Sequence, residues 1–124
     1  MNVVDSSGWL EYFADGPNAQ FFATPIENLD ALIVPTISLY EVFKRILQQK
    51  DESQALEAVA IMMQAKVVAI DATIALNAAK LSDALKLPMA DSMILATAHE
   101  YAATLWTQDG DFESITDVRY IAKK

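Results

Sequence analysis

Short runs of β-branched and apolar residues alternate along this chain with longer segments of helical periodicity. Buried strands are expected over residues 2–5, 32–34, 66–70 and 104–107, and a final edge strand over residues 118–122. Strands that alternate with helices form βαβ units, in which parallel strands are covered by helices on both faces. The sequence therefore predicts an α/β fold with a central, mostly parallel sheet of four to five strands and helices on both faces.

Apolar residues at helical spacing fill the segments between the expected strands. The pattern predicts helices over residues 9–13, 37–49, 52–64, 72–85 and 89–102. A further short helix is expected through Phe21 and Phe22, broken by Pro25. In the helix over residues 52–64, the residues expected on the buried face are Leu56, Val59, Ala60 and Met63.

Length and hydropathy indicate one folded domain spanning residues 1–124. The chain has 124 residues, of which 53% are hydrophobic, which is enough to bury a core. Its longest apolar run, Ala58 to Met63, is far shorter than the roughly 18 residues that span a bilayer. The N-terminus shows no basic region ahead of an apolar stretch, and the chain contains no cysteine. We therefore expect a cytoplasmic protein that does not enter the membrane.

The charge balance excludes several classes of function. With 17 acidic and 9 basic residues, the net charge is −8, so the chain has no general basic surface for nucleic acid. This counts against a simple DNA-binding module, but not against an enzyme that meets nucleic acid through a bound cation. Three glycines cannot supply a phosphate-binding loop. One histidine and no cysteine disfavour Ser-His-Asp and Cys-His catalysis.

Several carboxylates fall where the predicted sheet would gather them. Asp5 ends the first strand, and Asp109 and Asp111 follow the fourth. Glu41 and Asp91 lie near the starts of helices, which in this architecture begin at the same edge of the sheet. Open α/β sheets bind ligands at the carboxyl ends of their strands. We expect these four or five acids to converge on one rim.

Convergence of carboxylates without basic partners predicts a cation site. Two carboxylates about 4 Å apart repel by roughly 4 kcal/mol at an effective dielectric constant near 20. The sequence offers no obvious set of arginines to neutralise such a cluster. A hard divalent cation would do so, and oxygen ligands favour Mg²⁺ or Mn²⁺. Such an ion can activate water and stabilise the charge that develops in phosphodiester cleavage.

Two of these acids also have an ordinary helical interpretation. Ser38 and Glu41 match a capping box, and Glu41 could pair with Arg45 one turn later. Asp91 could favour its helix through the macrodipole. Lys44 and Arg45 are the best candidates to touch a phosphate backbone, and a solvated helix face is the equal alternative. These interpretations remain open at the level of sequence.

The remaining acids have ordinary interpretations as caps and turns. Asp5, followed by two serines, could belong to a helix cap, and Asp109-Gly110 is a common turn dipeptide. Asp71 also follows a strand, and for it we favour the cap. These local roles do not explain why the five remaining candidate acids all fall at one edge of one sheet. These acids are Asp5, Glu41, Asp91, Asp109 and Asp111.

The acids lie in four short motifs: Asp5 with Ser6-Ser7 behind it, Glu41 in Leu-Tyr-Glu-Val, Asp91 in Leu-Pro-Met-Ala-Asp-Ser, and Thr107-Gln-Asp-Gly-Asp-Phe112. Together these motifs resemble those of the PIN domain family, and more narrowly those of VapC-type toxins from bacterial and archaeal toxin–antitoxin pairs. The resemblance covers essentially the whole chain, in the right order. It implies a single PIN-like domain over residues 1–124.

The resemblance implies a metal-dependent endoribonuclease. Asp5, Glu41 and Asp91 match the three core acids of the family, and Asp109 or Asp111 supplies the fourth. In such sites the acids hold one or two Mg²⁺ or Mn²⁺ ions, which orient a water for in-line attack on an RNA phosphodiester. The products carry 5′-phosphate and 3′-hydroxyl ends.

The resemblance also implies supporting residues and partners. Ser6 and Thr107 match hydroxyl positions that support the acids or the metal-bound water. VapC-type proteins form homodimers and are inhibited by a cognate antitoxin whose C-terminal segment covers the acidic pocket. A basic antitoxin residue entering that pocket fits the net charge of −8. One departure is Gly110, where related sequences often carry a basic residue.

Other functions remain alternatives at this point. A PIN-fold nuclease could act in RNA processing or on structured DNA, and a toxin gene would differ by having an antitoxin gene beside it. A catalytically silent α/β binding module would bind metal weakly despite its acids. Phosphatases and receiver domains also place an acid after the first strand, but a haloacid-dehalogenase-type phosphatase needs a second one where this chain has Ser7.

Overall fold

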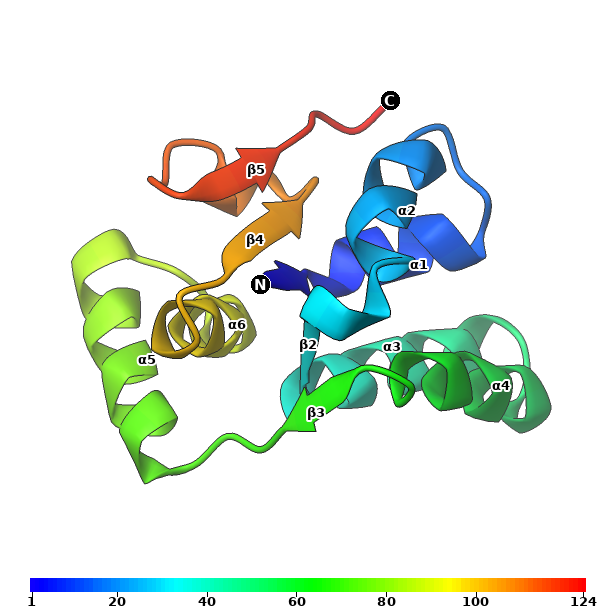
Figure 1. Cartoon of the computed structure of the whole chain (residues 1–124), viewed down its shortest axis with the longest axis horizontal. Coiled ribbons are helices and arrows are strands. Elements are labelled where there is room, and N and C mark those ends of the chain that lie inside the picture. The colour runs from blue at the N-terminus through cyan, green and yellow to red at the C-terminus, as the bar shows by residue number, and fades with distance from the viewer.

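A computed structural model describes all residues, 1–124, as one α/β domain built on a five-stranded sheet (Figure 1). All neighbouring strands are parallel, and their order is β3-β2-β1-β4-β5. The strands are β1 (Asn2–Val4), β2 (Leu32–Pro35), β3 (Lys66–Val68), β4 (Thr104–Thr107) and β5 (Val118–Tyr120). The predicted fold class is confirmed, and the sheet is entirely rather than mostly parallel.

Six α-helices and two short 3₁₀ helices connect the strands. The α-helices are α1 (Ser6–Phe13), α2 (Ala19–Ile26), α3 (Thr36–Gln49), α4 (Glu52–Met62), α5 (Ala72–Leu85) and α6 (Met89–Glu100). The 3₁₀ helices are η1 (Leu29–Ala31) and η2 (Gly110–Phe112). No helix is both long enough and apolar enough to cross a membrane.

Both faces of the sheet are buried, which explains why the strands read as continuous apolar runs. In β1, Val3 and Val4 point to opposite faces and join different hydrophobic clusters, and both are fully buried. The cluster around Val4 receives buried side chains from four helices. These side chains are Trp9 of α1, Phe22 of α2, Val42 of α3 and Met62 of α4.

The other face is covered by one helix, with a second packed outside it. Ile94 and Leu95 of α6 pack with Val3, and Phe112 of η2 closes the same cluster. Helix α5 packs mainly on α6 rather than on the sheet (Figure 1), and its Ile74 lies in one hydrophobic cluster with Ala96 of α6. This layer leaves the N-terminal turn of α6 at the carboxyl edge of the strands.

Strand β1 lies at the topological switch point of the sheet, where the order in which strands are added reverses. It pairs with β2 on one side and with β4 on the other, so the chain first builds outward to β3 and then returns. The main-chain N–H of Asp5 donates to the carbonyl of Trp106 at 2.9 Å, which fixes the end of β1 beside the end of β4. Ligand sites in open α/β sheets form at such a switch point.

Helix α1 differs from expectation at its start. It begins at Ser6 rather than near Trp9, and Asp5 is its N-cap residue without a capping side-chain hydrogen bond. Helix α2 contains Pro25 and ends one residue later. In the last helical turn, proline sacrifices one main-chain hydrogen bond, and its carbonyl still accepts from the N–H of Asn28 at 3.2 Å.

The buried face of α4 was predicted wrongly. Its buried residues are Ala55, Ala58 and Met62, whereas Leu56 and Met63 are exposed. Small residues turn inward here because α4 packs closely against α3. Four predicted ends lie two residues too far along the chain: α4 stops at Met62, β3 at Val68, β5 at Tyr120, and α6 at Glu100, just before Ala102 adopts a φ of 50°.

We predict that Gly8→Ala destabilises the fold by about 1–3 kcal/mol, the usual effect of overpacking. A Cβ at Gly8 would lie 2.6 Å from the ring of Phe22 and 2.7 Å from a methyl of Val4. Gly110→Ala is the matched control, because a Cβ there meets nothing within 4 Å. Urea unfolding measures both, and equal stabilities for the two variants would contradict this account of the α1–sheet contact.

Candidate metal centre

Asp5 lies at the centre of the carboxyl edge and is nearly inaccessible, with 3% of its surface exposed. Its Oδ2 accepts two hydrogen bonds, from Ser7 Oγ at 2.7 Å and from Thr107 Oγ1 at 2.9 Å. Both hydroxyls therefore hold the same oxygen, and Oδ1 is the atom left to face the site. Asp5 is the N-cap residue of α1, as the cap interpretation allowed, but its side chain makes no capping hydrogen bond.

Thr107 ties the first strand to the segment that carries two further acids. Its Oγ1 donates to Asp5 and accepts from the main-chain N–H of Asp109 at 2.9 Å. Asp109 Oδ1 in turn accepts from the N–H of Asp111 at 2.9 Å, which makes Asp109 the cap of η2. The turn interpretation of Asp109 is therefore correct, and it coexists with a place in the acidic site.

Glu41 lies in the second turn of α3 and is held from α1. Its Oε1 accepts from Ser6 Oγ at 2.7 Å. The capping box was wrong, because α3 begins at Thr36 with Pro35 as its N-cap residue, which places Ser38 inside the helix. Ser38 is fully buried there, and its hydroxyl has no hydrogen-bond partner.

The structure brings Asp91, Asp109 and Asp111 within metal-binding distance of one another. One carboxylate oxygen from each lies within 4.8 Å of the others. Asp91 and Asp109 are half-buried, and Asp111 is exposed. Both candidates for the fourth acid therefore reach the cluster, and the geometry does not separate them.

Electrostatic repulsion links these three acids to Asp5 and Glu41. The pKa of Asp91 is raised to about 8, first by burial, then by the charges of Asp5 and Asp109, and finally by a hydrogen bond and a charge from Asp111. Burial likewise raises the pKa of Asp5, two hydroxyl hydrogen bonds lower it, and the charges of Asp109 and Glu41 raise it again. Every charge acting on these two pKa values is a carboxylate.

The donor set fits a hard divalent cation. All candidate ligand atoms are carboxylate oxygens, which Mg²⁺ and Mn²⁺ prefer and which disfavour softer ions. The charges that raise the pKa values of Asp5 and Asp91 come from other carboxylates, so a cation would be a favourable partner. Asp71, by contrast, accepts from the N–H of Ile74 at 2.9 Å and caps α5 as predicted, away from this cluster.

Three polar residues of the site were missed from the sequence. Ser7, rather than Ser6, donates to Asp5. Gln108 is buried between Thr107 and Asp109, and its Nε2 donates to the carbonyl of Ser7 at 3.4 Å. Asn18, also buried, donates from Nδ2 to Gln108 Oε1 at 2.9 Å and so braces the acid-bearing segment from the α1–α2 turn. No local sequence pattern around Asn18 indicates this contact.

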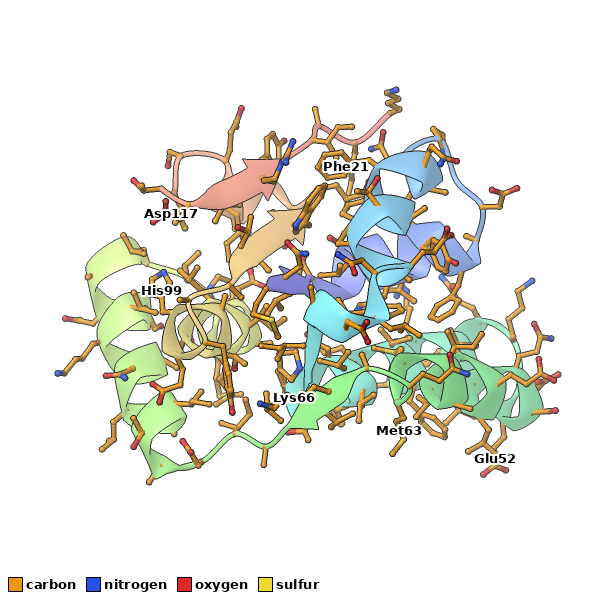
Figure 2. All side chains as sticks on the ribbon, viewed as in Figure 1. Phe21, Glu52, Met63, Lys66, His99 and Asp117 are labelled. Atoms are coloured by element: carbon orange, nitrogen blue, oxygen red, sulfur yellow. The ribbon has the colours of Figure 1, made fainter.

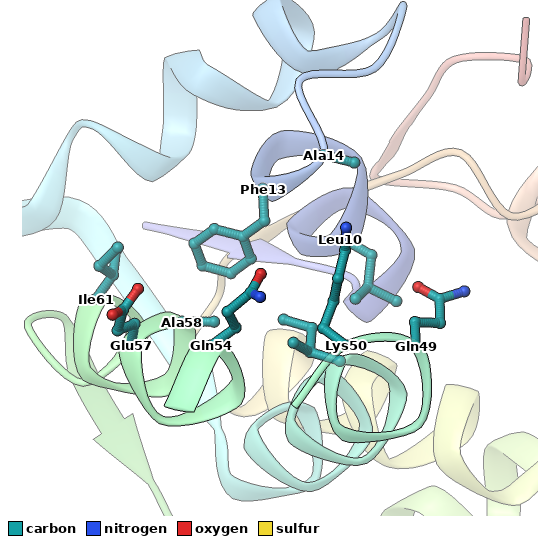
Figure 3. A pocket seen from close by; sticks show the side chains of 10 residues that line it. Leu10, Phe13, Ala14, Gln49, Lys50, Gln54, Glu57, Ala58 and Ile61 are labelled. Carbon is teal, nitrogen blue, oxygen red and sulfur yellow. The ribbon is translucent and has the colours of Figure 1, made fainter. Parts of the chain in front are cut away.

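A largely apolar groove lies between α1 and the hairpin of α3 and α4 (Figure 3). Its volume is about 250 Å³. Leu10 lies one helical turn beyond Ser6 in α1, and Ile46 lies five residues beyond Glu41 in α3, so the groove and the Ser6–Glu41 contact share the same two helices. Its other apolar residues are Phe13, Ala14, Ala58 and Ile61, and its polar ones are Gln49, Lys50, Gln54 and Glu57.

The chain belongs to the PIN domain family, whose model matches residues 3–118. No curated protein sequence matches the chain. The family membership agrees with the order of the motifs around Asp5, Glu41, Asp91 and Asp109.

Several solved structures share the fold at low sequence identity. A toxin–antitoxin complex from Klebsiella pneumoniae has a TM-score of 0.78 and 22% identity, covering 95% of each chain. The sarcin–ricin loop cleaving toxin VapC20 from Mycobacterium tuberculosis has a TM-score of 0.76 and 18% identity, covering 96% of this chain and 99% of that one. VapBC2 from Rickettsia felis, bound to a DNA fragment from its promoter, has a TM-score of 0.75 and 16% identity, covering 98% and 97%. These likenesses establish the fold.

The raised pKa of Asp91 predicts how the stability of the metal-free protein changes with pH. Between about pH 4 and 8 the folded protein keeps a proton on Asp91, whose pKa is about 8, that the unfolded chain has lost, since its pKa there is near 3.8. The free energy of unfolding therefore falls as pH rises through this range. In Asp91→Asn, the free energy of unfolding should fall less with rising pH. The variant should therefore melt at a higher temperature than wild type at pH 8 in EDTA.

Thermal melting at pH 5 and pH 8 checks this expectation, with Asp83→Asn on the exposed side of α5 as the control. Because Asp91 is only half-buried, solvent screening limits the size of the effect. An Asp91→Asn variant that is less stable than wild type at pH 8 would contradict the repulsion that we describe.

Proposed function

We propose that this protein is a metal-dependent endoribonuclease, the toxin of a type II toxin–antitoxin pair, acting in the cytoplasm. The observation that carries the proposal is the cluster of Asp91, Asp109 and Asp111 within 4.8 Å, joined electrostatically to Asp5 and Glu41 in a PIN fold. Structural neighbours that are toxins, one of them a cleaver of the sarcin–ricin loop, support an RNA substrate.

Asp5, Glu41, Asp91 and either Asp109 or Asp111 would hold one or two Mg²⁺ or Mn²⁺ ions. A divalent cation in such a site lowers the pKa of water and stabilises charge on a phosphodiester as it is cleaved. Attack by water on phosphorus gives the 5′-phosphate and 3′-hydroxyl ends that the family resemblance implies.

The chain's own hydroxyls set the orientation of the acids. Ser7 and Thr107 occupy Oδ2 of Asp5, and Ser6 occupies Oε1 of Glu41, so each carboxylate presents its other oxygen. Asp91 must lose its proton before it can bind a cation, which couples binding to proton release. Buried, hydrogen-bonded ligands of this kind are held in place before a substrate arrives.

We predict that Asp5→Asn, Glu41→Gln and Asp91→Asn each remove RNA cleavage. The loss should exceed the roughly 10- to 100-fold effect of removing an outer-shell partner, because each change removes the charge of a ligand. Cleavage of a labelled RNA pool by the purified protein, in EDTA, Mg²⁺ or Mn²⁺, measures this. Glu100→Gln, at the exposed end of α6, is the control and should cut normally.

A second readout separates loss of metal from loss of chemistry. Mg²⁺ or Mn²⁺ at 100 times the dissociation constant should raise the free energy of unfolding of wild type by about 2.7 kcal/mol, and its melting temperature with it. The rise should be much smaller in the three variants. Normal cleavage by these variants would refute the site. Absence of both RNA cleavage and metal-shifted melting would favour a silent binding module. Metal-shifted melting without cleavage of the pool would indicate a nuclease with a narrow target, and cleavage of DNA alone would favour the alternative nuclease.

The proposed antitoxin partner is supported by the groove of Figure 3. A helical segment packed against Leu10 and Ile46 would lie one turn from the Ser6–Glu41 contact, so its continuation would pass over the acids. A basic residue in that continuation would meet carboxylates that have no positive partner. Several structural neighbours are toxin–antitoxin complexes, in agreement with this arrangement.

The proposed homodimer is supported by a different apolar hollow on the outside of α3 and α4. Its lining includes Leu39, Phe43, Leu47 and Val59, and the neighbouring Tyr40 is 60% exposed. Apolar surface of this kind commonly marks a protein–protein contact.

We predict that Ile61→Asp abolishes binding of the antitoxin encoded beside this gene, because it places a charge in the apolar groove. Ile61 is 44% exposed, so the folded structure should tolerate the change. Isothermal titration of the purified pair measures the affinity, and Leu76→Asp, on the exposed side of α5, is the matched control. Equal affinities for the two variants would place the antitoxin elsewhere.

A further inference from the structure

We infer that a polar cavity beside the acidic site is a binding pocket for one nucleobase of the RNA and that its chemistry favours guanine. The inference rests on the proposed function and adds a determinant of sequence specificity to it. The cavity has a volume of about 360 Å³ and is bounded by the end of α5, the end of α6 and the segment from η2 to β5. Its lining includes Leu85, His99, Asp111, Ser114, Ile115 and Asp117.

Asp111 connects this cavity to the metal-binding cluster. One of its carboxylate oxygens lies within 4.8 Å of ligand atoms of Asp91 and Asp109, and the same residue lines the cavity. A phosphate held at the cluster would therefore have the cavity next to it. The base of an adjoining nucleotide is the part of the substrate that can enter.

The lining has the two components that a base requires. Leu85 and Ile115 supply apolar surface for the faces of a planar ring. His99, at the end of α6, and Asp117, just before β5, supply polar groups for its edge (Figure 2). Unpaired RNA bases are recognised in this way, through their faces and their hydrogen-bonding edges.

The charge of the lining selects the kind of ligand. Two carboxylates, Asp111 and Asp117, line the cavity, and no lysine or arginine does. This combination repels a phosphate and attracts N–H donors. Guanine presents two adjacent donors, N1–H and the N2 amino group, which match the two oxygens of one carboxylate. Adenine, cytosine and uracil each place an acceptor beside their donor.

Asp117 is the side chain best suited to make this contact and to test it. With Asp111 facing the metal cluster, it is the carboxylate that remains for the base. Its φ of 66° lies in the left-handed region, which asparagine and aspartate adopt more readily than other residues with side chains. Asp117→Asn therefore preserves the backbone but exchanges two acceptors for one acceptor and one donor, a pattern that no longer matches guanine and that matches adenine, the other purine, as well as the pyrimidines.

The test uses the purified full-length chain on a randomised RNA pool, with the cut ends sequenced. Wild type should show guanine enriched at one position next to the cut. Asp117→Asn should lower that enrichment by about tenfold, the usual size of a paired contact to a base edge, and raise adenine at the same position. Asp15→Asn is the matched control, because Asp15 also has a positive φ, 52°, and lies in the α1–α2 turn. It should keep the wild-type preference.

A binding measurement tests the pocket independently of cleavage. In EDTA, guanosine should shift the NMR signals of the His99 ring and the Asp117 amide more than adenosine does, and Asp117→Asn should reverse this order. Equal shifts by both nucleosides, or shifts elsewhere only, would overturn the pocket whether or not the protein cuts RNA. An unchanged cut-site preference in Asp117→Asn would also overturn it. A protein that binds guanosine here but cuts no RNA would count against the proposed function instead.

Discussion

The burial of one carboxylate, Asp5, among four others is the constraint on which the site depends. An ionised group that is 3% exposed requires hydrogen-bond donors or a cation. Two hydroxyls, from Ser7 and Thr107, hold one of its oxygens, but the charges of Asp109 and Glu41 act against its ionisation. The fold therefore holds mutually repelling carboxylates at the topological switch point of its sheet, and a divalent cation would relieve that repulsion.

Rigid elements keep these acids together despite their repulsion. Each acid lies at a strand end or within the first two turns of a helix, so its main chain is fixed by the apolar layers on both faces of the sheet. Gln108 and Asn18 add a buried polar brace between the acid-bearing segment and α1. Without such support, carboxylates would separate or take up protons rather than stay poised for a ligand.

The sequence predicted the elements and the edge at which the acids meet, because both follow from local patterns. Buried parallel strands give apolar runs, and the residues that follow them must lie at one rim. The partners of those acids could not be predicted in the same way. Asn18 and Gln108 are 90 positions apart, and no local pattern joins them. The capping box at Ser38 failed because α3 already begins at Thr36, with Pro35 as its N-cap residue.

Because the chain has a net charge of −8, the cation would have a second role in the proposed function, which is to bind the phosphate of the RNA. An RNA backbone approaching this rim meets carboxylates at the cluster and again in the cavity beside Asp111, while Lys44 and Arg45 lie exposed on α3 rather than within the cluster. Phosphate contact at the cluster therefore depends on the bound ion itself. In the same site, a basic antitoxin residue would satisfy the same carboxylates, so inhibitor and cation would compete for one set of charges. The clustering of the acids, which makes them repel one another in the free protein, would thus also allow the proposed antitoxin to bind them and inhibit cleavage.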